Sequence, residues 1–167
     1  MNRRYTAEEY YEKCRLLRKY FRNPALTTDV IVGFPGETEE EFAQTERFLE
    51  TVHFSDMHIF KYSKRRGTKA ADMPNQIDPQ IQSVRSEKLI ALGERMKDDF
   101  LEACKDQEQI VLIEEETEID GTKYMTGHSK NYIRCAFEMD GLVPNMVIKG
   151  TINSKLNEEF VFCKRID

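Results

Sequence analysis

The sequence lacks the cysteine and histidine spacings that mark metal sites and disulfide frameworks. Its four cysteines lie far apart and form no CxxC or CxxxCxxC pair: Cys14, Cys104, Cys135 and Cys163. Scattered single cysteines are most often small buried hydrophobic residues. The three histidines are also not spaced like a ligand pair: His53, His58 and His128. We therefore expect no metal ligand in this chain.

Long apolar runs are also lacking. No stretch approaches the roughly 20 apolar residues that a membrane-spanning helix needs. The start of the chain, MNRRYTAEEYYEK, has no apolar core like that of a secretory signal peptide. These absences predict a cytoplasmic protein without a membrane partner.

The chain has no basic excess. Its formal net charge is −5, and the imbalance is confined to residues 106–167, which hold 7 Lys and Arg against 12 Asp and Glu. Residues 1–105 hold 18 of each sign. Nucleic-acid-binding proteins usually show a basic footprint, so the total counts mildly against this class, although local clusters can override it.

The stretch TTDVIVGFPGET, residues 27–38, predicts a strand, a turn and the start of a helix. The β-branched run Val30–Val32 is typical of a buried parallel strand. In the turn, Gly33 and Gly36 would let the backbone approach another group closely. Ligands bind beyond the carboxyl ends of parallel strands, so residues 33–37 would lie on a functional rim. The same glycine pattern also occurs in plain turns.

The elements around this stretch predict parallel βα units. Capping boxes at Thr6 and Thr38 begin helices of about residues 6–22 and 38–52. A short strand follows at residues 57–60, and Asp78-Pro79 starts a long helix that reaches about residue 105. The order helix, strand, helix, strand is typical of α/β folds.

The segment between the second strand and the long helix is strongly basic. Residues 61–71 hold five positive charges and no negative one. The sequence leaves two interpretations open. The segment is either a solvated loop or a phosphate-binding loop on the same rim as residues 33–37.

The C-terminal part predicts an all-β module. Short strands separated by turn signals are expected at residues 110–113, 124–126, 132–137, 146–149 and 160–163. We place the acidic run 114–118 and an Asp120-Gly121 turn between the first two strands. Five strands in so short a stretch predict a small antiparallel barrel, and such barrels often bind oligonucleotides. Tyr132 and Arg134 would share one strand face and form an RNA-binding surface. Alternatively, Tyr132 would be a core residue and Arg134 would face the solvent.

Three segments together resemble the radical-SAM tRNA methylthiotransferases: TDVIVGFPGETEEEF, HIFKYSKRRGTKAADMPNQI and GHSKNYIRCAF. These enzymes add sulfur and a methyl group at C2 of a modified adenosine beside the anticodon. The second and third segments look closest to the branch that acts on N6-threonylcarbamoyladenosine at tRNA position 37. The isopentenyladenosine and ribosomal-protein branches look less similar. The match covers essentially the whole chain.

The resemblance implies a fold for each part. Residues 1–104 would be the last part of a radical-SAM (βα) barrel, and residues 105–167 a TRAM domain, an OB-like five-stranded antiparallel barrel that binds tRNA. The full-length enzyme would use S-adenosyl-L-methionine and two [4Fe–4S] clusters to form a 5′-deoxyadenosyl radical.

The sequence departs from the family in its cysteines. The family's three N-terminal cluster cysteines and its CxxxCxxC motif do not occur in this sequence, and cluster assembly needs convergent thiolates. The resemblance therefore implies a C-terminal fragment, inactive alone, with no cluster and at most weak S-adenosyl-L-methionine binding. Its missing partners would be the N-terminal domain and the cluster-bearing half-barrel.

The resemblance also implies site residues, none of them catalytic. The expected cofactor-binding residues are Gly33, Pro35, Gly36, Glu37, Ser63 and Arg65. The residues expected to bind the anticodon region of tRNA are Lys64, Arg66, Lys130, Asn131, Tyr132 and Arg134. Arg3 and Arg4 would belong to a basic patch that closes the preceding strand.

Two other functions remain open, and the predicted sheet also implies self-association. In the first, the chain would be a stand-alone RNA-binding module. In the second, it would belong to the isopentenyladenosine or the ribosomal-protein branch of the methylthiotransferases. A sheet of few strands leaves an unpaired edge that recruits other chains, so we also expect self-association.

Overall fold

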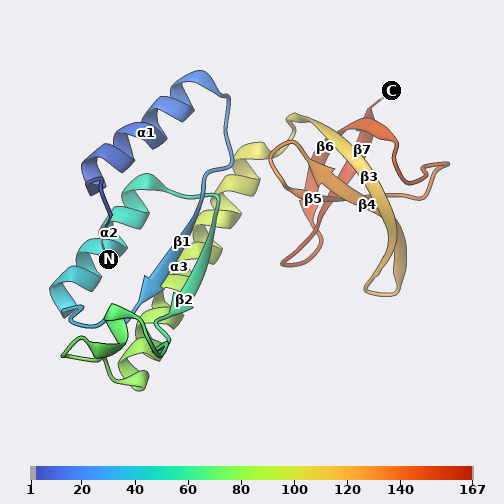
Figure 1. The fold of residues 1–167 in the computed structure, drawn as a ribbon. Coiled ribbons are helices and arrows are strands. Elements are labelled where there is room, and N and C mark those ends of the chain that lie inside the picture. Colours follow the sequence, from blue (N-terminus) through green and yellow to red (C-terminus); the bar gives the residue numbers. More distant parts are fainter. Residues whose placement is uncertain (1–2, 167) are drawn as a thin grey trace. The chain divides into compact units, whose positions relative to one another are not determined.

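A computed structural model describes residues 3–166, and the chain divides into two units, Met1–Phe100 and Leu101–Asp167. Helices and strands up to the end of the long helix are α1 (Ala7–Tyr20), β1 (Thr27–Val32), α2 (Glu39–Val52), β2 (Asp56–Lys61), η1 (Lys69–Asp72) and α3 (Pro79–Cys104). Figure 1 shows their order along the chain. The predicted βα order is confirmed, and the short 3₁₀ helix η1 within the basic segment is an element that the sequence analysis missed.

The predicted helix starts are confirmed by their capping interactions. At α2, the Glu41 N–H donates to the Thr38 hydroxyl at 3.1 Å, and the Glu41 carboxylate accepts the Thr38 N–H at 2.8 Å. Thr6 and Glu9 form the same reciprocal pair at α1. Each cap is worth about 1 kcal/mol, because it satisfies backbone donors that the helix leaves unpaired.

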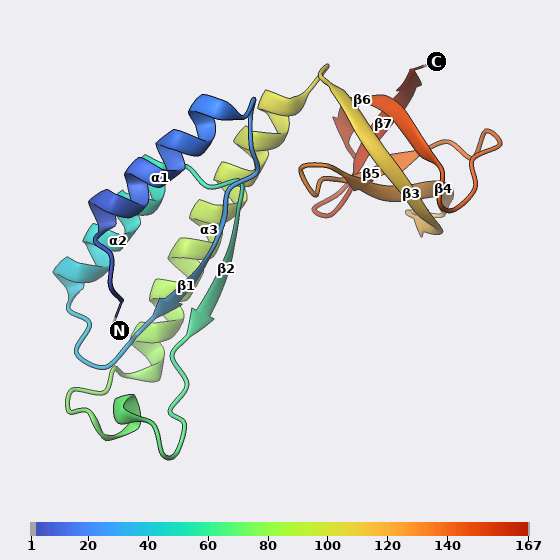
Figure 2. The ribbon, with the colours of Figure 1, turned by 45° about the horizontal axis from the view of Figure 1, so that its top comes forward.

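β1 and β2 are parallel, with Thr27 opposite Asp56 and Val32 opposite Lys61. Their carboxyl ends therefore meet at one edge, as predicted. One face of the pair packs on the helices: Val30, Val32 and Met57 join a buried cluster with residues of all three helices. α3 runs alongside both strands in both ribbon views (Figures 1 and 2).

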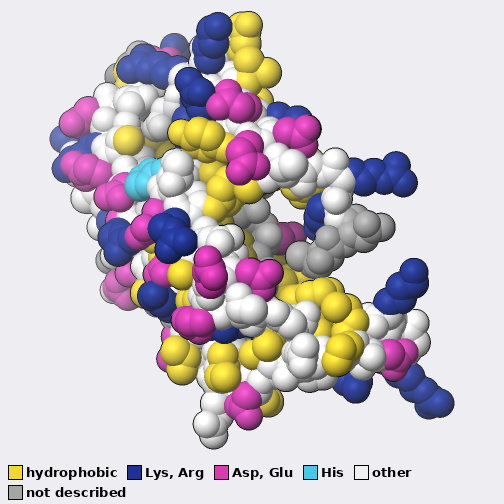
Figure 3. Space-filling model, turned by 90° about the vertical axis from the view of Figure 1, so that its left-hand side faces the viewer, with side chains coloured by type: hydrophobic (Ala, Val, Ile, Leu, Met, Phe, Trp, Pro, Cys, Tyr) yellow, Lys and Arg dark blue, Asp and Glu magenta, His cyan; other side chains and the backbone are white. Residues whose placement is uncertain are grey.

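The other face of the two-stranded sheet is exposed. Because strand side chains alternate between faces, the residues between the buried ones point away from the helices. Asp29 lies opposite His58, and Ile31 lies opposite Phe60. Asp29, His58 and Phe60 are exposed, and Phe60 keeps 51% of its surface in solvent. On one side of the molecule, apolar side chains also lie between acidic and basic ones (Figure 3).

The second unit is a closed barrel of five strands in the order β3-β4-β5-β7-β6. The strands are β3 (Glu108–Ile119), β4 (Thr122–Ser129), β5 (Arg134–Phe137), β6 (Val147–Lys155) and β7 (Val161–Ile166). The five predicted strands are present, but the prediction that all of them pair antiparallel is wrong, because β5 and β7 are parallel. A closed ring with an odd number of strands cannot alternate direction throughout, so one neighbouring pair has to be parallel.

The first barrel strand is longer than predicted. The acidic run 114–118 belongs to β3 itself, and a register shift between Ile113 and Glu115 bends the strand there. Such a bulge lets one long strand pair with β6 over its first half and with β4 over most of its length. The predicted turn is confirmed, since Asp120 and Gly121 both have positive φ.

Within residues 3–166, no helix combines the length and the apolar character needed to cross a membrane.

Candidate cofactor rim and nucleic-acid interface

The two glycines of the turn after β1 have different surroundings. Both adopt positive φ, at +72° for Gly33 and +87° for Gly36. A Cβ on Gly33 would collide with the side chain of Gln82, so Gly33 is required for packing against α3. Gly36 is exposed, and nothing lies within 4 Å of the position that a Cβ would take there. Its N–H donates to the Asn75 carbonyl at 2.9 Å. Gly36 therefore offers open backbone at the rim.

The carboxylate of Glu37 is directed into the protein. It accepts the Gly33 N–H at 2.7 Å and a guanidinium N–H of Arg85 at 2.6 Å. The side chains of Glu37 and Arg85 are only 13% and 6% exposed. Pro35 is also buried. Glu37, a predicted cofactor residue, therefore fixes the shape of the turn through an internal ion pair.

Arg85 is a residue that the site prediction missed. It also bonds Glu39 at 3.0 Å and the Glu37 carbonyl at 3.2 Å, and it lies over the ring of Phe42 at 5.2 Å. Burial by itself would lower the pKa of Arg85, but hydrogen bonds to Glu39 and Glu37 outweigh burial and raise it. The signal in the sequence was spacing, since Arg85 continues the buried stripe of Leu89, Leu92 and Met96.

An aromatic pair stands beside the turn. The rings of Phe34 and Tyr62 meet edge to face, with centroids 5.4 Å apart. The Tyr62 N–H donates to the Val32 carbonyl at 2.8 Å, which holds the start of the basic segment against the end of β1. The Tyr62 hydroxyl is buried and has no hydrogen-bond partner among the described residues. A buried unpaired hydroxyl is costly, so it marks a place where a ligand atom would be favoured.

The predicted loop residues lie on the solvent side of this rim. Residues 63–68 are all exposed, among them Ser63, Lys64, Arg65 and Arg66. The loop is folded at its end, because the Thr68 hydroxyl donates to the Arg65 carbonyl at 2.7 Å and caps η1. The structure thus brings the loop and the glycine turn to one edge. Arg3 and Arg4 are exposed at the start of the described chain.

In the barrel, the predicted shared face of Tyr132 and Arg134 is wrong. Tyr132 lies in a turn with φ +59°, and β5 starts only at Arg134. Ser129 holds this turn: its carbonyl accepts the Tyr132 N–H at 2.9 Å, and its hydroxyl accepts the N–H groups of Asn131 and Ile133. The turn pushes Tyr132 outward to 84% exposure. Lys130 is exposed beside it.

Two further contacts organise the surface around Tyr132. The His128 ring lies 5.7 Å from the Tyr132 ring, and its Nδ1 is 2.7 Å from the Glu114 carboxylate. Arg134 lies over the ring of Phe160 at 4.1 Å and donates to Glu159 at 2.6 Å. His128, Phe160 and Glu159 were not in the predicted site.

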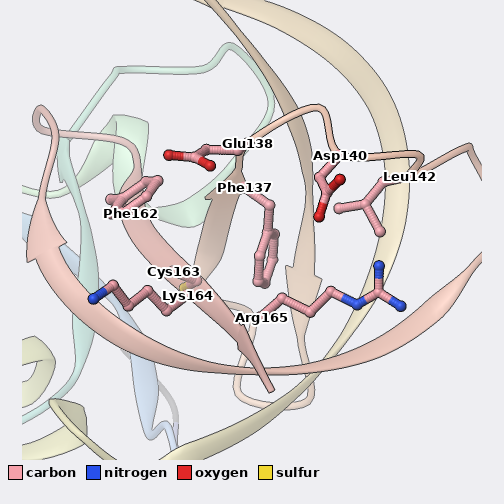
Figure 4. Close-up of a pocket in the computed structure, with 8 residues that line it drawn as sticks. All are labelled: Phe137, Glu138, Asp140, Leu142, Phe162, Cys163, Lys164 and Arg165. Carbon is pink, nitrogen blue, oxygen red and sulfur yellow. The ribbon is translucent and has the colours of Figure 1, made fainter. Parts of the chain in front are cut away.

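A shallow hollow of about 180 Å³ lies beside β5 and β7 (Figure 4). Phe137 and Phe162 contribute to its walls, and Lys164 and Arg165 share it with Glu138 and Asp140. The two cations of the hollow are matched in number by its two carboxylates.

The cysteines do not fit an iron–sulfur cluster. All four are buried, and no group of three metal-ligating side chains converges within residues 3–166. Burial raises the pKa of Cys14. A hydrogen bond with Cys163, together with burial, raises the pKa of Cys135 far above the ordinary thiol range. Cluster ligation needs accessible thiolates, so these residues cannot supply it.

Comparison with known proteins finds similarity to the radical SAM superfamily and to tRNA-modifying enzymes. A model of the radical SAM superfamily matches residues 1–49. The chain is 39% identical over 140 residues to threonylcarbamoyladenosine tRNA methylthiotransferase of Bacillus subtilis, which is 83% of this chain and 31% of that protein. It is 34% identical over 154 residues to tRNA-2-methylthio-N(6)-dimethylallyladenosine synthase of Acetivibrio thermocellus, or 92% of this chain and 32% of that one. The synthase of the same name from Caldicellulosiruptor saccharolyticus is 46% identical over 96 residues, 58% of this chain and 20% of the relative. The chain thus spans about a third or less of the length of these relatives.

Proposed function

This chain belongs to the radical-SAM tRNA methylthiotransferase family, and we propose that it supplies a cofactor rim and an RNA-binding barrel to a longer enzyme. That enzyme methylthiolates C2 of N6-threonylcarbamoyladenosine at tRNA position 37. The observation that carries the proposal is the rim itself: an open glycine turn, an aromatic pair and a basic loop at one edge of two parallel strands.

The choice of substrate rests on two supports. The segments YSKRRGTKAA and GHSKNYIR have the form of the threonylcarbamoyladenosine branch. The relative of that name also matches over 83% of the chain at 39% identity. The second candidate substrate is an isopentenyl-type adenosine, because a synthase named for dimethylallyladenosine reaches 46% identity over a shorter stretch.

The rim fits the adenosine part of S-adenosyl-L-methionine. Gly36 offers exposed backbone, Phe34 and Tyr62 offer ring edges, and the buried Tyr62 hydroxyl lacks a partner among the described residues. Arg65 and Ser63 lie on the loop that follows, where they would contact the ligand from the solvent side. When bound, the cofactor supplies the radical and the methyl group.

The iron–sulfur clusters do not fit this chain, since its thiols are buried and dispersed. They would be held by other parts of the longer enzyme. The chain alone is therefore inactive in the radical reaction, and its own binding of S-adenosyl-L-methionine is weak because the opposite wall of the site is not part of it.

The barrel would be the TRAM domain of this enzyme and bind the anticodon region of tRNA. Exposed Tyr132 offers a stacking surface, and Lys130 and Arg134 offer positive charge beside it. The net negative charge of residues 106–167 keeps the affinity modest, and the phosphate contacts of Lys130 and Arg134 would make it sensitive to salt.

The test expresses the full-length protein in cells that lack their own methylthiotransferases and analyses tRNA nucleosides by mass spectrometry. We expect 2-methylthio-N6-threonylcarbamoyladenosine. The double reversal Arg65→Glu with Arg66→Glu should reduce it without unfolding the protein, whereas reversal of Lys13 and Lys19 on α1 should not. Appearance of 2-methylthio-isopentenyladenosine instead would favour the second candidate.

Two results would overturn the proposal. If neither nucleoside forms and a ribosomal protein gains the modification, the enzyme belongs to the ribosomal-protein branch. If no modification appears while RNA still binds, the chain acts as an RNA-binding module only.

A further inference from the structure

The site prediction used only one end, at Tyr132 and Arg134, of an outer face of the barrel. On β4, β5 and β7 the residues Met125, Cys135, Phe137 and Cys163 are buried in the interior. The residues between them face outward. Thr126 lies opposite Ala136, and Ala136 lies opposite Phe162, so these three form a row across the outer face of the three strands.

The centre of this row is covered by other side chains of the barrel. Ala136 is fully buried and clusters with Ile119 and Phe160, and Tyr124 packs against the same cluster. The outer face therefore has a small core of its own, and this core fixes the positions of the rings around it.

The aromatic residues of the barrel gather on this side. Residues 105–167 contain five aromatic residues, and of these only Phe137 belongs to the barrel interior. The other four are Tyr124, Tyr132, Phe160 and Phe162. Tyr124 and Phe162 are half-buried and meet edge to face with centroids 6.2 Å apart. They form one aromatic platform, and Tyr132 with His128 forms another, at 5.7 Å.

The two platforms lie at opposite ends of the face. Tyr124 and His128 are on the same strand, four residues apart, which corresponds to about 14 Å along β4. Arg134 lies opposite His128 in register, and its guanidinium is held over the ring of Phe160 at 4.1 Å. A planar guanidinium oriented in this way is suited to phosphate.

A second cation marks the other end. Lys164 is two residues beyond Phe162 on β7 and is exposed. Figure 4 shows Lys164 on the same side as Phe162, with Arg165 pointing the opposite way. The ion pair between Arg134 and Glu159 has side chains 38% and 65% exposed, so it is a surface pair that a phosphate can replace.

We propose that the outer face of β4, β5 and β7 is a track for single-stranded RNA. Bases stack on Tyr132 at one end and on Tyr124 and Phe162 at the other, and phosphates contact Arg134 and Lys164. The proposal rests on the proposed RNA-binding role of the barrel and names the surface that performs it. β4 and β5 are the second and third strands of the barrel, the pair by which OB-type barrels take oligonucleotides.

The chemistry of the face favours unpaired RNA over a duplex. Aromatic platforms can reach only bases whose faces are open, whereas double-stranded RNA is read through its backbone and groove shape. The cations are few and separated by aromatic rings, which matches a strand whose bases and phosphates alternate along the track.

The test measures binding of the whole chain to a fluorescein-labelled unstructured RNA and to a blunt duplex of the same sequence, by anisotropy. Tyr132→Asn removes the ring but suits the left-handed backbone of this turn, so it should leave folding intact. We expect it to weaken single-strand binding about tenfold, the effect of losing one stacked base. The double variant Tyr124→Leu with Phe162→Leu, which keeps apolar volume, should weaken it similarly.

Two further variants sharpen the result. Lys164→Gln should lower the slope of log affinity against log salt by about 0.7, the share of one single-strand phosphate contact. Val147→Asn is the matched control, because Val147 is 66% exposed on β6, outside the track. Its affinity should equal that of the unaltered chain.

The outcomes are distinct. Unchanged single-strand affinity for Tyr132→Asn, or equal affinity for the duplex, overturns the track while leaving RNA binding by the barrel in place. If the unaltered chain binds neither RNA, the proposed function of the barrel fails as well. If the double variant unfolds, the affinity of Tyr132→Asn and the salt slope of Lys164→Gln decide whether the track exists.

Discussion

Arg85 and Glu37 form a nearly buried ion pair, 2.6 Å long, that joins α3 to the glycine turn after β1. The same carboxylate oxygen also accepts the Gly33 N–H at 2.7 Å. The turn that contains Gly36 is therefore shaped by a guanidinium from a residue of α3, 48 positions beyond Glu37 along the chain. Preorganised rims of this kind hold a ligand without having to reorder first.

Replacing Arg85 should destabilise the first unit strongly. Arg85→Met leaves the Glu37 carboxylate nearly buried without its charge partner, and breaking a buried pair in this way costs about 3–5 kcal/mol. Urea unfolding measures the change. Arg95→Met is the matched control, since Arg95 pairs with Glu50 on the surface at 3.0 Å with both side chains at least half exposed. That change should cost under about 1 kcal/mol. Equal effects of the two substitutions would refute the structural role of Arg85.

The two turn glycines should respond differently to alanine. Both positions lie at positive φ, so each alanine costs about 1–2 kcal/mol of backbone strain. Gly33→Ala adds a collision with Gln82, whereas Gly36→Ala meets open space. We therefore expect Gly33→Ala to lower the thermal midpoint further. Adding Gln82→Ala should recover part of the Gly33→Ala loss and none of the Gly36→Ala loss; recovery in both would argue against a specific contact.

The stability of the barrel should fall at alkaline pH. The hydrogen bond with Cys163 and burial raise the pKa of Cys135 in the folded state, whereas the unfolded thiol ionises near its ordinary value of about 8.5. The folded state thus holds its proton after the unfolded state has lost it. The free energy of unfolding should be unaffected below about pH 8 and then decrease by about 1.4 kcal/mol per pH unit.

Denaturant titrations at several pH values measure this slope. Cys135→Ala should flatten it, while Cys14→Ala in the other unit should leave the barrel's slope unchanged. The same burial predicts that none of the four cysteines reacts with iodoacetamide until the chain unfolds. Rapid labelling of Cys135 in the native protein would contradict this prediction.

The exposed sheet face should promote self-association of the chain. Ile31 and Phe60 lie opposite each other on the uncovered side of β1 and β2, and each strand pairs on one edge only among the described residues. Uncovered apolar faces and unpaired strand edges recruit other chains. Light scattering should show an average mass that rises with concentration, and Phe60→Lys should reduce it. A constant monomer mass for the unaltered chain would exclude this behaviour.

Much of the local structure was predictable because it depends on neighbouring residues. The capping boxes at Thr6 and Thr38, the strand before Gly33 and the Asp120-Gly121 turn all follow from short-range hydrogen bonding and φ preferences. The meeting of the glycine turn and the basic loop at one edge was predictable too, because it follows from parallel pairing.

The errors concern long-range pairing. The acidic run 114–118 predicts a connection, yet β3 continues through it, and its acidic side chains at 114, 115, 116 and 118 all remain exposed. The period of two predicts a strand at Tyr132, yet Ser129 pairs with Ile133 and the chain turns between them.

The sequence by itself determined most of the helices and strands of this protein, its motifs and the two turn glycines, since these rest on residue type and short spacing. Only the tertiary structure decided that Glu37 turns inward to Arg85, that β5 and β7 run parallel, and that four aromatic residues share one side of the barrel. The physical reason is distance along the chain. Partners separated by tens of residues are chosen by packing and by the closure of the barrel, and neither leaves a local pattern to read.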